Sequence, residues 1–170
     1  AYPQMDELLL NREEYPDWLI EYLIGHEEAV DWVIDYPEYM VKTEEEINEE
    51  ALKPVNLEEY QSQEGIPMFF QWDQTWGYAS YGDGNIAING CGPTCLSMVA
   101  TGLLGDTSMT PKWVADFSSS SGYCTENGET SWTLMSEGAA QLGLYARQMD
   151  RWYASALIEE LSAGYPIICS

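Results

Sequence analysis

The fold of this chain is decided at residues 89–105, which read NGCGPTCLSMVATGLLG. Glycines flank Cys91 on both sides, and glycine permits a tight turn and a close approach of a substrate to the backbone. Pro93 suits the first turn of a helix, where its missing N–H is not needed, and Gly105 is a typical helix end. We therefore predict a helix from about Pro93 to Leu104, with Cys91 at its start.

A cysteine at the start of a helix is a candidate nucleophile. The unpaired N–H groups and the positive end of the helix dipole stabilise a thiolate, which is the reactive form of the side chain. The N–H of Cys91 is also placed to donate into an oxyanion hole. The alternative interpretation of Cys91 is a small buried residue or a disulfide partner, and the Gly-Cys-Gly-Pro pattern favours the nucleophile.

The segment ahead of this helix offers a second oxyanion donor. Residues 69–76 read FFQWDQTW and contain two side-chain amides. Gln71 is our first choice for the donor and Gln74 the second.

The flanking pattern predicts an α+β fold. Further helices are expected at residues 110–117, at 130 or 131 to 142, and at 152–163, with short extended elements at 86–88, 144–149 and 166–170. Because the last of these strands would lack a partner within the sequence, we expect a missing or incomplete β lobe to pack against it.

The first part of the chain has a different composition. Residues 1–65 carry 19 acidic and 3 basic side chains, a net charge of -16, out of -23 for the whole chain. Residues 13–22 and 27–36 each hold a Trp and a Tyr four positions apart, which predicts a hairpin of short helices whose aromatic residues pack inward. We expect Gly25 and Pro37 to end these two helices.

This change of composition predicts two regions. Residues 1–65 are expected to form an acidic helical accessory segment and linker, in which Thr43 and Glu46 cap a helix. Residues 66–170 are expected to form the domain that carries the chemistry. A cover for the cleft, like a propeptide, is an alternative role for the acidic segment.

Charge and composition exclude several functions. With six basic residues against 29 acidic ones, the chain is not suited to contact phosphates, so we expect neither nucleic acid nor anionic membranes as partners. No apolar run is long enough to cross a membrane. A single histidine, His26, and the absence of a Cys-x-x-Cys pair lead us to predict no metal and no cofactor.

An ordered series of motifs in residues 66–170 resembles the papain-like cysteine peptidases related to bacteriocin-leader-processing enzymes, especially their stand-alone exported relatives. The series comprises FQWD at 70–73, WGY at 76–78, YG at 81–82, GCGPT at 90–94, Met98, Gly105, TP at 110–111 and AGYPII at 163–168. The resemblance implies a papain-like fold and a thiol protease, a hydrolase of peptides or proteins. It also implies a bacterial protein that acts outside the cell or in the cell envelope.

The same resemblance implies roles for individual residues. Cys91 would attack the peptide carbonyl, and Gln71 together with the Cys91 N–H would hold the oxyanion. The family's base is a histidine at the start of a later strand, oriented by Asp or Asn, and we expect both in sequence beyond residue 170. His26 is expected to have a capping or surface role instead.

Other interpretations remain open. The series Cys91-Gly-Pro-Thr-Cys95 is similar to a thioredoxin motif with one residue too many, and a cell-wall amidase of the cysteine-histidine type would share Cys91. A non-catalytic module that binds peptides or wall components on a degenerate papain-like fold is a third possibility. Cys95 is expected in the core, while Cys124 and Cys169 belong to no motif.

Overall fold

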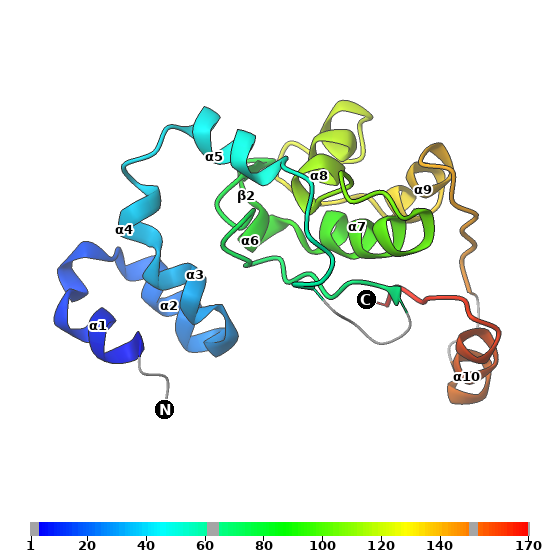
Figure 1. Ribbon diagram of the computed structural model, residues 1–170, viewed down its shortest axis with the longest axis horizontal. Helices are drawn as coiled ribbons and strands as arrows, with labels where there is room; N and C mark the ends of the chain where they lie inside the picture. The colour runs from blue at the N-terminus through cyan, green and yellow to red at the C-terminus, as the bar shows by residue number, and fades with distance from the viewer. Residues whose placement is uncertain (1–3, 61–64, 150–152, 170) are drawn as a thin grey trace.

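The computed structural model describes residues 4–60, 65–149 and 153–169, and it is mostly helical (Figure 1). The strands β1 (Ser80–Tyr81) and β2 (Gly84–Asn85) form an antiparallel pair, so the fold is α+β in a broad sense. The α-helices are α1 (Gln4–Leu10), α2 (Asp17–Gly25), α3 (Val30–Ile34), α4 (Tyr36–Tyr39), α5 (Glu44–Ala51), α6 (Ile86–Asn89), α7 (Cys91–Leu104), α8 (Pro111–Ser120), α9 (Glu137–Gln141) and α10 (Ala154–Ser162). Turns of 3₁₀ helix lie at Arg12–Glu14, Glu27–Ala29 and Trp132–Met135.

The helices with strong local signals form as expected. Helix α7 begins at Cys91, two residues earlier than predicted, and ends at Gly105 in the left-handed conformation. Helix α8 begins with Pro111, and the Thr110 side chain accepts a hydrogen bond from the Trp113 N–H at 3.1 Å. The predicted capping box of Thr43 and Glu46 is present at the start of α5. These ends are set by contacts between residues a few positions apart.

Three expected elements have a different structure. Residues 86–88, predicted as extended, form helix α6, because the Asn85 side chain caps it by accepting from the Ile88 N–H at 3.1 Å. The single helix predicted up to residue 142 is broken at Ser136, which separates a 3₁₀ turn from α9, and Leu134 in that turn is fully buried. The strand predicted at 144–149 is irregular.

The C-terminal part also departs from expectation. Residues 165–169 are irregular rather than a strand, since neither they nor residues 144–149 have a strand to pair with in the described chain. The last predicted helix is confirmed over residues 154–162 as α10, which has no buried residue and lies apart from the other helices (Figure 1). Its predicted first residue, Trp152, lies outside the described residues. Residue 170, the last of the predicted strand, lies outside the described residues.

The helical hairpin predicted near the N-terminus is present as α2 and α3. Gly25 is the last residue of α2, as predicted, whereas Pro37 lies within α4 instead of ending a helix. The expected inward packing holds for Trp32, which is fully buried, but Trp18 is 48% exposed and contacts Tyr36 edge-on.

One cluster of buried side chains crosses residue 65, the predicted boundary between the two regions. Trp32 stacks on Tyr78 with ring centroids 4.9 Å apart, and Tyr39 stacks on the same ring at 4.2 Å. The Tyr78 hydroxyl donates to the Trp32 carbonyl, and the Tyr39 hydroxyl donates to the Gln74 carbonyl. The two regions are therefore joined by aromatic packing as well as by the chain.

Gly77 makes this packing possible. A Cβ atom at this position would lie 2.7 Å from Cδ1 of Trp32 and 2.9 Å from the Asp73 carbonyl oxygen. Only a residue without a side chain allows the indole ring to lie against the backbone here. The docking of the N-terminal helices therefore requires a glycine at position 77.

We predict that Gly77→Ala destabilises the protein by about 1–3 kcal/mol, the usual cost of overpacking a buried site. Urea unfolding followed by tryptophan fluorescence would measure the change. Gly25→Ala is the matched control, because a Cβ there has no neighbour within 4 Å. An unchanged midpoint for Gly77→Ala would show that Trp32 does not pack against this backbone.

We also predict that stability falls in the alkaline range. Burial, followed by the charge of Asp35, raises the pKa of Tyr39 to about 12, whereas a tyrosine in the unfolded chain ionises near 10. A raised pKa in the folded state gives a contribution that is complete below pH 10 and is lost as the pH approaches 12. Urea midpoints measured across this range should fall less steeply for Tyr39→Phe than for the wild type. Tyr145→Phe, at an exposed position, should keep the wild-type slope.

Candidate functional site

Cys91 lies at the very start of α7 with an exposed side chain. The preceding Gly90 donates its N–H to the Ile86 carbonyl at 2.8 Å and accepts the Thr94 N–H at 2.9 Å, so α7 starts directly on the end of α6. Among the described residues, no hydrogen bond uses the Cys91 N–H. The thiol and a free backbone donor therefore occur together at the positive end of a 14-residue helix.

The two glycines around Cys91 are needed for close packing. A Cβ at Gly90 would lie 2.5 Å from the Ile86 carbonyl oxygen, which confirms the tight turn. A Cβ at Gly92 would lie 2.8 Å from Cγ2 of Thr130, a residue almost forty positions later. The first turn of α7 is thus held between α6 on one side and Thr130 on the other.

Thr130 is itself held by a buried tyrosine. The Tyr81 hydroxyl hydrogen-bonds to Oγ1 of Thr130 at 2.8 Å and to Oγ of Ser118 at 2.9 Å, and burial raises the pKa of this tyrosine. Backbone pairing of Thr130 with Cys124 fixes the same segment. Sequence reasoning missed Thr130, because no local pattern links it to Cys91.

Gln71, the first choice for the oxyanion donor, reaches the element that leads into α7. Its Nε2 donates to the Ala87 carbonyl at 2.6 Å, four residues before Cys91, and its side chain is half-buried. Gln74 is exposed, and only its backbone carbonyl is engaged, by Tyr39. Of the two predicted amides, the described hydrogen bonds link only Gln71 to α6.

The N-terminal helices also contribute to this area. Tyr22, from α2, donates its hydroxyl to the same Ala87 carbonyl at 3.0 Å. The ring of His26 packs on Tyr22 with centroids 4.3 Å apart and lies 6.4 Å from the ring of Trp72. Nδ1 of His26 lies 3.8 Å from Oε1 of Glu28, and no interaction among the described residues joins His26 to Cys91.

The remaining cysteines do not form disulfides. All four cysteines are described, and all are free thiols. Cys95 is half-buried one turn after Cys91, and burial, followed by the neighbouring Cys91, raises its pKa. Its thiol is therefore harder to ionise than an ordinary one. The sequence predicts Cys95 in the core, but its side chain is only half-buried. The raised pKa does not favour a redox pair.

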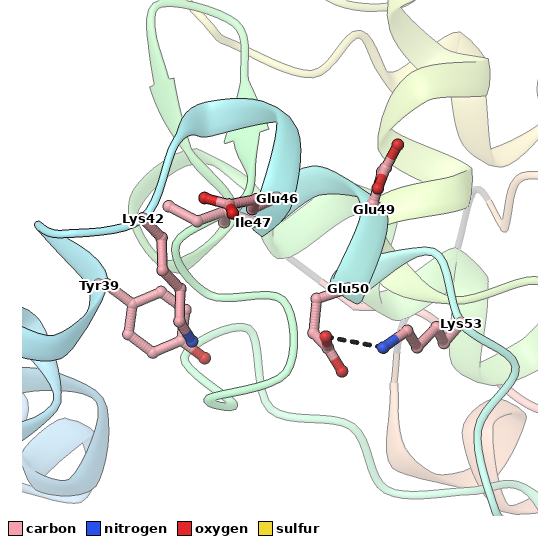
Figure 2. Close-up of a pocket in the computed structure, with 7 residues that line it drawn as sticks. All are labelled: Tyr39, Lys42, Glu46, Ile47, Glu49, Glu50 and Lys53. Carbon is pink, nitrogen blue, oxygen red and sulfur yellow. Dashed lines mark hydrogen bonds and ion pairs between the residues drawn. The ribbon is translucent and has the colours of Figure 1, made fainter.

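A separate cavity of about 310 Å³ lies beside α5 and is lined by residues between positions 39 and 53 (Figure 2). Lys42 lies over the ring of Tyr39 at 4.2 Å, and Lys53 pairs with Glu50 at 2.7 Å. Figure 2 shows these cations already turned toward partners in the protein. None of the predicted site residues lines this cavity.

None of the described helices has the length and apolar character needed to cross a membrane. No cluster of three or more His, Cys, Asp or Glu side chains in the described part is arranged to hold a metal ion.

Comparison of the chain with protein-family models, with curated proteins and with solved structures found no match.

We predict that Gly92→Ala destabilises the start of α7 by about 1–3 kcal/mol, because the new methyl group would clash with Thr130. The double variant Gly92→Ala with Thr130→Ser should recover part of this loss, since serine removes Cγ2 and keeps the hydroxyl that bonds to Tyr81. Urea unfolding of both single variants and the double variant measures the coupling. Strictly additive effects would contradict the contact.

Proposed function

We propose that this chain carries the nucleophilic half of a cysteine peptidase that hydrolyses peptide bonds through Cys91. The observation that supports the proposal most is the exposed thiol at the first residue of α7, beside its own unused N–H. A thiolate there is stabilised by the helix terminus, and a carbonyl oxygen bound beside it meets a free donor.

The proposed reaction proceeds in two steps. The Cys91 sulfur attacks the carbonyl carbon, and the negative charge that forms on oxygen is held by the Cys91 N–H and the amide of Gln71. The C–N bond then breaks, the amine leaves with a proton, and the acyl group remains on sulfur. Water attacks this thioester in the second step and releases the acid and the thiol.

The amide of Gln71 fits this role because it has two N–H hydrogens. One is donated to the Ala87 carbonyl, which fixes the side chain, and the other remains to be donated to an oxyanion. The base that takes the thiol proton is proposed to be the histidine expected after residue 170. Extracellular or envelope location and a papain-like fold are part of the same proposal.

The exposed apolar side chains of the C-terminal segment support a further lobe that packs there. In α10 and just after it, Ile158 is 63% exposed, Leu161 54% and Tyr165 61%. Large apolar groups gathered on one segment are typical of a surface that another part of a protein covers.

Labelling with iodoacetamide, read at each cysteine by peptide mass spectrometry, tests the proposed nucleophile. We predict that Cys91 reacts on the order of two- to fivefold faster than Cys169 near pH 6, which is the effect of a helix terminus on a charge. Cys169 is the internal control, because it is exposed and lies in no helix. For each cysteine, the rate near pH 6 is divided by its own rate near pH 9. This ratio corrects for the different accessibility of the two thiols.

Equal pH profiles for the two cysteines would overturn the catalytic proposal. The non-catalytic binding module would then be the better interpretation of the fold.

A further inference from the structure

On the basis of the proposed function, we infer that Tyr22 is a positioning residue for the oxyanion donor Gln71, so that the N-terminal helices complete the active site. The key observation is that one backbone carbonyl accepts hydrogen bonds from two side chains. The Ala87 oxygen receives Nε2 of Gln71 at 2.6 Å and the hydroxyl of Tyr22 at 3.0 Å. These residues come from opposite sides of the predicted boundary at residue 65.

The carbonyl is well placed to set the geometry of the site. Ala87 is buried in α6, whose last turn leads through Gly90 into Cys91. A carbonyl oxygen has two lone pairs, so it can accept both donors at once. Gln71 and Tyr22 are therefore fixed on the same atom, four residues from the nucleophile.

Tyr22 restricts the amide in a way that Ala87 alone does not. A side-chain amide held by one hydrogen bond can still rotate about that bond. Because both side chains donate to the same Ala87 oxygen, the Tyr22 hydroxyl lies beside the Gln71 amide and limits its rotation. This second neighbour restricts the amide, as a preorganised oxyanion donor needs.

Tyr22 is itself firmly held by the N-terminal helices. Its ring contacts Trp32 edge-on with centroids 5.5 Å apart and packs on His26 at 4.3 Å. Leu19 and Leu23, on the same helix, are buried in the core that crosses residue 65. The position of the Tyr22 hydroxyl therefore depends on the docking of α2 and α3. N-terminal helices without fixed contacts to the rest of the protein would not hold this hydroxyl in place.

The test compares two reactions of Cys91, one of which forms an oxyanion while the other does not. Transfer of the acyl group from the β-mercaptoethanol thioester of N-acetylalanine forms a tetrahedral oxyanion. The thiolate attacks the carbonyl carbon, the bond to the leaving sulfur breaks, and the released thiolate takes up a proton from water. Alkylation by iodoacetamide displaces iodide at a saturated carbon and forms no oxyanion. The ratio of the two rates at Cys91 thus reports the oxyanion donors apart from the reactivity of the thiol.

We predict that Tyr22→Phe lowers this ratio on the order of tenfold, while Gln71→Ala lowers it on the order of a hundredfold. The double variant should be no slower than Gln71→Ala, because a positioning residue acts only through the group it positions. The matched control is Tyr15→Phe, which removes a hydroxyl donated at 3.1 Å to the Ile34 carbonyl within the N-terminal helices. It should leave the ratio at the wild-type value.

The outcomes separate the inference from the proposed function. If Gln71→Ala lowers the ratio and Tyr22→Phe behaves like Tyr15→Phe, the peptidase proposal stands and the role of Tyr22 is wrong. If Gln71→Ala also leaves the ratio unchanged, Gln71 is no oxyanion donor and both fail. An unchanged iodoacetamide rate in Tyr22→Phe shows that the variant still folds around Cys91.

Discussion

The structure depends on the contact between the indole of Trp32 and the backbone at Gly77. The ring is fully buried, and it fills the space that any side chain at position 77 would need. Residues 1–65 have a net charge of -16 and the rest of the chain -7, so charge opposes the association of the two parts. The burial of apolar and aromatic side chains must therefore outweigh this repulsion. The stacked rings of Trp32, Tyr78 and Tyr39 provide such burial between the two parts.

This contact has an identifiable cost. Nε1 of Trp32 is buried without a hydrogen-bond partner among the described residues, which costs about 1–3 kcal/mol. Removal of a buried tryptophan side chain usually costs about 3–5 kcal/mol, and each aromatic pair adds about 0.5–1.5 kcal/mol. The packing therefore outweighs the unpaired N–H. The position of Tyr22, and through it the geometry around Ala87, follows from this balance.

Features set by neighbouring residues could be predicted from the sequence. The capping box of Thr43 and Glu46, the proline at the start of α8 and the left-handed Gly105 each involve only a few consecutive positions. The placement of Cys91 at a helix start belongs to the same group. The prediction missed the local Asn85 cap that makes residues 86–89 a helix, and it failed at residues 144–149, where a strand needed a partner.

The sequence by itself determined the helix that begins at Cys91, the glycines around that residue and the acidic composition of the N-terminal region, because these depend on residue type and local order. Only the tertiary structure decided that Thr130 packs against Gly92 and that Tyr22 shares the Ala87 carbonyl with Gln71. The partners in these contacts are separated by 16 to 65 positions in the sequence. No periodicity or spacing of residues encodes such a pairing. They meet because burial of aromatic surface, which has no direction of its own, brings the two regions together, and hydrogen bonds then select the arrangement.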